Sequence, residues 1–405
     1  IRQIFPGESI EDVPAAVRKA VLEAGTLNRI KPGQSVALTA GSRGIASGPL
    51  IYREMVMLIK SRGAIPFIVP AMGGHGGATS EGQLAMLRHL GITEEFCGCP
   101  IRSSMNTVCL GHTEKNGIPV YVDALAAAAD AVVLVNRIKP HTSFRGPVES
   151  GLVKMTAIGL GKGKGADQCH SMGMGSMSEN ICEIASFIYN KLPVAFGLGI
   201  LENAHKGVEQ VVCLPTEDIL EREPALLSRA FELMPQIYFR SYDVLVLDEI
   251  GKNISGPGMD CNVISRYTVE SMPPDKRQEV VVVLDLTEES HGNAHGMGLA
   301  DIATKRFFNK IDFESTYINS LTALSMHASP MPMILESDKM AIQAAIKFCP
   351  GSDRTNPKII RARNTMNLEQ IYISEALLPE ARKLSGIEIL GEPEYMPFDE
   401  KGNLF

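Results

Sequence analysis

The chain has 405 residues, of which 45% are hydrophobic and 21% are charged, and its formal net charge is −7. This composition is typical of a globular protein of two or three domains, and it excludes a disordered or collagen-like chain. The excess of acidic over basic residues argues against a general nucleic-acid-binding protein, which needs a basic surface to neutralise phosphates.

Short β-branched segments alternate with longer segments of helical periodicity along the chain. Strands are expected at residues 35–38, 65–69, 131–135, 194–198, 242–247, 279–286 and 331–335. Helices are expected at residues 48–62, 81–90, 179–190, 216–233 and 337–347. This alternation predicts an α/β fold with mostly parallel sheets, and the wholly apolar strands predict helices on both faces of a sheet.

The best domain boundary follows the last helix of the N-terminal half, because a new strand begins at Tyr242. We expect an N-terminal α/β domain at residues 1–240, a C-terminal α/β domain at 241–385 and a polar tail at 386–405. Ligand sites form preferentially in clefts between domains. The sequence therefore predicts two α/β domains with a cofactor cleft between them.

No apolar run approaches the roughly 18 residues that a membrane helix needs, and the first residues lack the charged-then-apolar order of a secretory signal. Of the eight cysteines only Cys97 and Cys99 are close together, and a single C-x-C pair is a weak zinc signal. We therefore expect free thiols in a cytoplasmic protein that binds neither nucleic acid nor membrane.

Two strand-exit loops contain more glycine and polar residues than a turn requires. The first, TAGSRGIASG (39–48), contains Ser42 and Arg43, and an arginine there can bind a carboxylate or phosphate through two hydrogen bonds. The second, PAMGGHGGATSEGQ (70–83), places His75 among four glycines, where the imidazole is sterically accessible. Either side chain could also be an ordinary surface residue.

The third strand-exit loop, NRIKPHTSFRGPVESGLVKM (136–155), concentrates positive charge in an acidic chain. It contains His141, Arg145 and Lys154 with two further cations. A solvated surface is the ordinary explanation, but the local concentration of charge favours an anion site. With His75 it offers two imidazoles suited to acid–base chemistry, and a lysine near glycines is suited to covalent attachment of a cofactor.

The fourth loop, AIGLGKGKGADQCHSMG (157–173), resembles a phosphate-binding loop, although it fits neither of the two standard glycine motifs. His170 follows it, beside Cys169, and both are candidate metal ligands or ordinary residues. The residues that would surround an anion here are Gly159, Gly161, Lys162, Gly163 and Lys164.

The ordered set His75, His141, Lys154 and His170 resembles the lactate racemase family, which uses a nickel-pincer nucleotide. The separations of 66 residues between the first two and 16 between the last two are those expected of the family, and the interval of 13 from His141 to Lys154 is slightly longer. The resemblance covers most of residues 35–270.

This resemblance implies two α/β domains with the cofactor between them. It implies pyridinium-3,5-bisthiocarboxylic acid mononucleotide joined covalently to Lys154, with Ser42 and Arg43 among its contacts. Nickel would be held at this attachment point by the cofactor and His170. His75 and His141 would form the acid–base pair.

The chain departs from the family pattern at positions that bear on the substrate. The first loop keeps Arg43 but has no Asp beside it. The segment DEIGKNISGPGMDCNVISRYT keeps Asp260 and Asn262, but Ser265 and Thr268 stand where the family has Gln and Lys. These differences imply a substrate other than lactate.

Because the family's lysine is absent, a positive charge that binds the substrate would have to come from another residue of the second domain. Lys252 or Arg266 could supply it. His295 lies in LTEESHGNAHGMGLAD, a glycine-rich loop directly after a strand, near Glu288 and Glu289. A polar surface loop would have the same composition. The candidate substrate contacts are Arg145, Lys252, Asp260, Asn262 and His295.

The resemblance therefore predicts an isomerase, a racemase or epimerase that inverts C2 of a 2-hydroxy acid or sugar acid. Expected partners are this substrate, the proteins that make the cofactor, and further copies of the chain in a homo-oligomer. The residues alone leave two alternatives open. One is a hydrolase or lyase with zinc or manganese bound directly to His75, His141 and His170; the other is a non-enzymatic nucleotide-binding protein.

Overall fold

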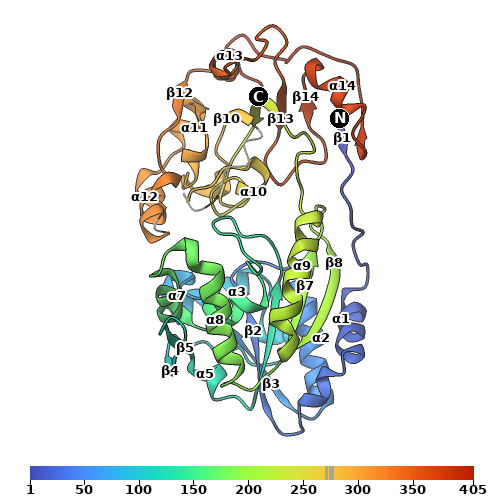
Figure 1. The fold of residues 1–405 in the computed structure, drawn as a ribbon, viewed down its shortest axis with the longest axis vertical. Coiled ribbons are helices and arrows are strands. Elements are labelled where there is room, and N and C mark those ends of the chain that lie inside the picture. Colours follow the sequence, from blue (N-terminus) through green and yellow to red (C-terminus); the bar gives the residue numbers. More distant parts are fainter. Residues whose placement is uncertain (270–271, 273–277, 324) are drawn as a thin grey trace. The chain divides into compact units, whose positions relative to one another are not determined.

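The computed structural model describes residues 1–269, 272, 278–323 and 325–405, and the chain divides into two compact units (Figure 1). The N-unit comprises Pro6–Met234, and the C-unit comprises Ile1–Phe5 together with Pro235–Phe405. The first residues belong to the C-unit because β1 (Arg2–Gln3) pairs antiparallel with β15 (Ile387–Glu388). The expected domain at 1–240 thus differs from the N-unit at both ends.

The N-unit contains a five-stranded sheet in the order β3–β2–β6–β7–β8 and a separate β4–β5 hairpin. All neighbours in the sheet pair in parallel except β8, which is antiparallel to β7. The strands are β2 (Ser35–Ala40), β3 (Ile65–Pro70), β4 (Thr107–His112), β5 (Pro119–Asp123), β6 (Ala131–Arg137), β7 (Val194–Glu202) and β8 (Val208–Pro215).

Helices cover both faces of this sheet (Figure 1). The helices are α1 (Val13–Glu23), α2 (Gly48–Ser61), α3 (Ser80–His89), α4 (Glu94–Cys97), α5 (Ala124–Ala127), α6 (Leu152–Lys154), α7 (Lys162–His170), α8 (Met177–Tyr189) and α9 (Ile219–Leu233). Helices α1 and α2 share a core with Val36 and Val133, whereas α8 shares a second core with the intervening Ala37 and Val132. Successive side chains of a strand point to opposite faces of the sheet, so a strand that is apolar throughout is buried on both faces.

The C-unit contains a six-stranded sheet in the order β12–β11–β10–β9–β13–β14, in which all neighbours pair in parallel except β14, which is antiparallel to β13. Its strands are β9 (Tyr242–Leu247), β10 (Gln278–Val283), β11 (Ile302–Thr304), β12 (Met333–Leu335), β13 (Ile359–Ala362) and β14 (Tyr372–Ile373). Its helices are α10 (Cys261–Ile264), α11 (Lys305–Asn309), α12 (Phe313–Thr322), α13 (Asp338–Phe348) and α14 (Leu378–Ala381). The terminal segment packs Met396, Phe398 and Leu404 against this core.

The prediction of an α/β fold with mostly parallel sheets is confirmed. The eight cysteines are free, as predicted, and six of them are buried. In the part of the chain that the structure describes, no helix has both the length and the apolar character needed to cross a membrane.

The glycine-rich segment at 157–173 was expected to be a loop, and this expectation is wrong. A π-helix over Met155–Gly159 is followed after Leu160 and Gly161 by α7. The glycines permit close packing of backbone: a Cβ on Gly159 would lie 2.7 Å from the carbonyl oxygen of Ala71, and one on Gly161 would lie 2.9 Å from Gly165 Cα. Glycine here serves helix packing, since no side chain would fit.

Candidate active site

Three of the predicted loops follow neighbouring strands. Ser42 and Arg43 follow β2, His75 follows β3, and His141 follows β6. Because β3, β2 and β6 are adjacent and parallel, their carboxyl ends lie at one edge of the sheet. In α/β folds this edge is where ligands bind. The topology therefore brings these loops together.

The His75 imidazole is held at one nitrogen. Its Nδ1 is hydrogen-bonded to the Ser42 hydroxyl. Exclusion of water by the surrounding loops, together with the positive charges of Arg43, Lys154 and His170, lowers the pKa of His75 to about 4. Near neutral pH the ring is therefore neutral and can accept a proton.

His141 is held in a different way. The backbone N–H of Ser143 donates to Nδ1 at 3.1 Å, so the neutral ring carries its proton on Nε2. The ring packs on Phe144 with centroids 4.4 Å apart. Burial, followed by the charges of Lys154 and Lys139, lowers its pKa well below the usual value. His141 therefore presents an N–H donor in its neutral state.

A buried carboxylate fixes the backbone at His141. Glu149 accepts the His141 N–H at 2.6 Å and lies 3.3 Å from the guanidinium of Arg145. Arg145 also donates to the His141 carbonyl oxygen at 2.7 Å and lies over the Phe231 ring of α9. Arg145, a predicted substrate contact, is thus bonded to the protein's own loop in this structure.

Lys154 ends the short helix α6. Its Nζ lies 5.5 Å from the centre of the Phe144 ring. Burial and the charge of Lys139, with a smaller contribution from Arg43, lower the pKa of Lys154 to about 8. About a tenth of the amines are then neutral at pH 7, far more than for an ordinary lysine.

The turn that carries Lys154 is capped by a residue distant in sequence. Glu223 of α9 accepts the backbone N–H of Leu152 at 2.8 Å and that of Val153 at 3.1 Å. Burial raises the pKa of this carboxyl group to about 7. A Cβ on Gly151 would lie 2.2 Å from Glu223 Oε1, so this approach requires glycine.

His170, the predicted metal ligand, lies at the end of α7. Its Nδ1 is 2.6 Å from the carbonyl oxygen of Ala166. A carbonyl only accepts, so Nδ1 carries the proton and Nε2 keeps its lone pair. A metal-binding histidine is usually oriented in this way by a partner on its other nitrogen. The charge of His170 contributes, after larger causes, to the lowered pKa values of His75 and His141.

The predicted anion cradle is not assembled as expected. Lys162 is buried and ion-paired with Asp123 at 2.9 Å, so its ammonium faces the protein interior. Gly159 and Gly161 are occupied by packing, as described above. Only Gly163, with open space around it, and the exposed Lys164 keep an accessible face.

In the C-unit, several predicted substrate residues have local partners. Asp260 caps α10 by accepting the Asn262 N–H at 2.8 Å. The guanidinium of Arg266 lies 2.7 Å from Asp301, which neutralises the charge considered for the substrate. Ser265 and Thr268 are buried.

Lys252 and His295 lie close together in the same unit. Lys252 Nζ donates to the carbonyl oxygen of Gly256 at 2.5 Å and to Asn319 at 2.6 Å. His295 is 6% exposed, and its Nδ1 is 2.8 Å from the Ser320 hydroxyl. Burial and the charge of Lys252 lower the pKa of His295 to about 4.

Four residues that shape the site were not predicted: Phe144, Glu149, Glu223 and Gln83, which is described below. Glu149 is the single carboxylate in the basic loop 136–155, and this contrast was a usable signal. Glu223 had none, because it lies 71 residues from the Leu152 amide that it caps.

No group of three or more His, Cys, Asp or Glu side chains among the described residues is arranged to hold a metal ion. The direct-metal alternative needs His75, His141 and His170 around one ion. Its geometry is therefore not present in the described chain. A metal held by one histidine and a cofactor places no such demand on the protein.

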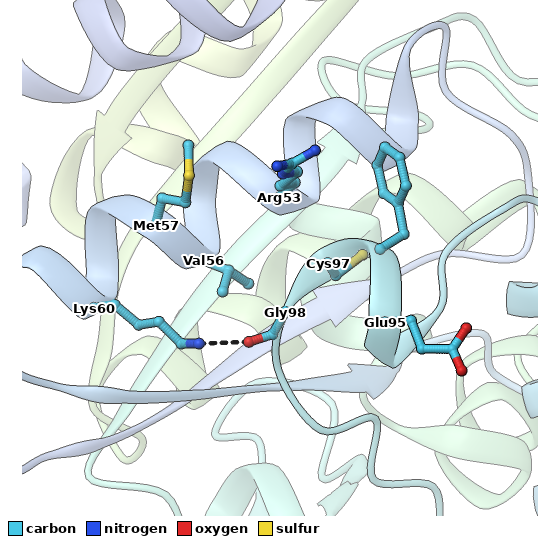
Figure 2. A pocket seen from close by; sticks show the side chains of 8 residues that line it. Arg53, Val56, Met57, Lys60, Glu95, Cys97 and Gly98 are labelled. Atoms are coloured by element: carbon cyan, nitrogen blue, oxygen red, sulfur yellow. Dashed lines mark hydrogen bonds between the residues drawn. The ribbon is translucent and has the colours of Figure 1, made fainter.

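Two surface hollows of about 300 Å³ each are present in the described residues of the N-unit. One lies between α2 and α4, with Arg53, Met57 and Phe96 in its wall and the Lys60 ammonium bonded to the Gly98 carbonyl (Figure 2). It contains no predicted site residue. The other is lined by Ser42, three residues of α3 and Leu90 just after that helix, and so touches the loop that carries Arg43.

No family model and no curated protein matches the chain. Among solved structures, the chain is similar to the lactate racemase apoprotein from Thermoanaerobacterium thermosaccharolyticum, with a TM-score of 0.55, 12% identity, and coverage of 91% of this chain and 99% of that one. A protein from Thermotoga maritima is similar over 67% of this chain and 70% of that one, with a TM-score of 0.49 and 15% identity. The chain therefore has a lactate racemase-like fold.

Proposed function

We propose that this protein is a racemase or epimerase that inverts C2 of a 2-hydroxy acid by using a nickel-pincer nucleotide attached to Lys154. The observation that carries the proposal is the placement of His75 and His141 in loops at one edge of the N-unit sheet, with Lys154 and His170 near enough for their charges to affect both imidazoles. The fold shared with a lactate racemase supports it. Fold alone does not imply activity, so the argument depends on the chemistry of these four side chains.

The residues fit the cofactor. Lys154, with a pKa of about 8, offers a neutral amine for the covalent bond. His170 offers an Nε2 lone pair for nickel, because Nδ1 is bonded to a carbonyl oxygen. Arg43 and Lys139 add positive charge suited to the phosphate of a nucleotide. When bound, the cofactor supplies reversible acceptance of the C2 hydride.

The two imidazoles manage the hydroxyl proton. His75 is neutral and can accept that proton, while His141 presents Nε2–H to a substrate oxygen. A carboxylate substrate beside them raises the pKa of both rings, since an anion favours their charged forms. The hydroxyl occupies a different position in each of the two stereoisomers, and two separately held histidines provide a proton-transfer group for each.

The substrate is proposed to be a 2-hydroxy acid other than lactate, with sugar acids as first candidates. The first loop has no Asp beside Arg43, and Ser265 and Thr268 replace the charged and amide side chains expected after Asn262. Cofactor-making proteins must supply the nucleotide, and a homo-oligomer remains part of the proposal.

The test is racemisation of 2-hydroxy acids and sugar acids in D₂O by protein co-produced with cofactor-making enzymes. Chirality and deuterium at C2 are both measured. We expect inversion with little deuterium at C2, because a hydride that moves to the cofactor and back never exchanges with solvent. A mass increment on the Lys154 peptide should accompany activity.

Variants complete this test. Lys154→Ala should lose the mass increment and turnover, whereas Lys191→Ala, which removes an exposed lysine at the end of α8, should lose neither. His75→Ala and His141→Ala should keep the increment and lose about 10²–10⁴-fold in kcat. Stoichiometric deuterium at C2, or full activity without the adduct, would contradict the proposal.

A further inference from the structure

We infer that the buried Lys162 is a positioning residue which, with Asp123 and Gln83, fixes the loop of His75 against α7, the helix that ends in His170. This inference rests on the proposed function only for the roles of the two histidines. It replaces the expected role of Lys162 as an anion ligand.

The ammonium of Lys162 makes two hydrogen bonds and one ion pair. Nζ lies 2.5 Å from the carbonyl oxygen of Pro70, 3.1 Å from Gln83 Oε1 and 2.9 Å from Asp123 Oδ2. The side chains of Lys162 and Asp123 are 1% and 0% exposed. Two of the three N–H donors of this ammonium are thus hydrogen-bonded inside the protein, and the carboxylate of Asp123 neutralises its charge.

Gln83 extends the contact to the loop of His75. Its side-chain amide donates to the carbonyl oxygen of Gly73 at 3.0 Å and to that of His75 at 3.2 Å. Its oxygen accepts from Lys162. Lys162 thus bonds the end of β3 at Pro70, where the loop begins, and Gln83 bonds the loop further along.

The other side of the contact is α7, which begins at Lys162. The Gly73 N–H also donates to the carbonyl oxygen of Gly159, just before α7, at 3.2 Å. A shift of α7 would therefore move the attachment points of the loop. The network couples the position of His75 to that of the helix bearing His170.

Two features show that this arrangement is costly. Lys162 has a φ of +54°, a conformation uncommon for residues other than glycine. Burying an ion pair removes both charges from water, and the attraction between them rarely does more than offset that loss. Such strain persists where surrounding contacts over-determine it, often at functional sites. Here the contacts that hold Lys162 in its strained and buried state are the same contacts that fix the position of the loop.

The experiment is hydrogen–deuterium exchange of the full chain, followed by mass spectrometry. Gln83→Met removes the amide but leaves the ion pair, and Lys162→Met/Asp123→Asn removes both charges together, so that no buried charge is left unpaired. Both variants should increase exchange in peptides covering 71–79 by about tenfold and leave α1 and α2 unchanged.

The matched control is Glu54→Gln, which removes a buried carboxylate bonded to Arg18 at 2.8 Å between α1 and α2. It should increase exchange in α1 and α2 and leave 71–79 unchanged. The NMR signals of the His75 ring should move in the first two variants and stay in place in the control.

Exchange in 71–79 that stays within about twofold in Gln83→Met would overturn the inference. The outcomes also separate it from the proposed function. If exchange in 71–79 increases in the variants but the protein racemises no 2-hydroxy acid, the inference is retained and the proposed function is contradicted. An active racemase with an unchanged loop in Gln83→Met would retain the function and remove the inference.

Discussion

The loop after β3 and the loop after β6 each carry one histidine, and they are held in opposite ways. Around His75, side-chain donors from Gln83 and Lys162 bind backbone carbonyl oxygens. Around His141, the carboxylate of Glu149 binds a backbone N–H. The first loop is glycine-rich, and His75 is the more exposed of the two residues, whereas His141 is partly buried.

The difference extends to the rings. The Ser42 hydroxyl beside His75 Nδ1 can donate or accept by rotating, so it tolerates a neutral or a charged ring. The Ser143 amide beside His141 Nδ1 can only donate, so protonation of that nitrogen breaks a hydrogen bond. The two imidazoles are therefore not equivalent: His75 is the more readily protonated, and His141 is held as an Nε2–H donor.

Among the substitutions that test the difference between the two loops, we expect the largest effect for Glu149. Glu149→Ala leaves the His141 N–H and the guanidinium of Arg145 without their buried carboxylate. We expect a loss of about 3 kcal/mol in the free energy of unfolding and about a 10²-fold lower kcat, with the Lys154 adduct retained.

Glu149→Gln keeps an oxygen acceptor and should recover part of both losses. The measurements are chemical unfolding followed by circular dichroism and steady-state kinetics. Full activity in Glu149→Ala would show that the carboxylate does not position His141.

Glu223 should produce a smaller effect that depends on pH. Burial raises the pKa of its carboxyl group from 4.5 to about 7, so the folded chain binds a proton that the unfolded chain has released. The contribution of Glu223 to stability therefore falls as pH rises from 4.5 to 7, by as much as about 3 kcal/mol.

Glu223→Gln removes this pH dependence. Both capped N–H groups bond to one oxygen of Glu223, so the glutamine oxygen can keep both bonds. The variant should match the native protein near pH 4.5 and exceed it in stability at pH 8. Parallel stability curves for the two proteins would show that Glu223 does not titrate in this range.

The sequence predicted the sheets and the site loops better than it predicted what holds them. Strand β9 was predicted at its observed bounds, because an apolar β-branched run between polar residues has few other interpretations. The β4–β5 hairpin was missed although its connection contains Asn116-Gly117, since its strands lack strong alternation and the connection is six residues long.

In the site, too, the positions of loops were predictable from the sequence, whereas long-range side-chain partners were not. Arg43, His75 and His141 follow strands, so topology alone brought them to one edge. Lys162 was misjudged because a G-K-G run looks the same whether its backbone binds an anion or packs as a helix. The burial of that lysine depends on Asp123, 39 positions earlier, and no local pattern reports such a partner.

The smallest effect concerns the order in which the two rings become charged. Both pKa values lie below 6.5, so the folded protein loses stability as pH falls below that value, where the unfolded chain binds the protons first. In the apoprotein, the ¹⁵N signals of His75 should change at a higher pH than those of His141, because only Ser42 can accommodate the charged ring. Ser42→Ala should narrow this gap by lowering the pKa of His75, and it should leave His141 unchanged. If His141 became charged first, the inequivalence of the two loops would not extend to their imidazoles, and the assignment of His75 as the proton acceptor would have to be reversed.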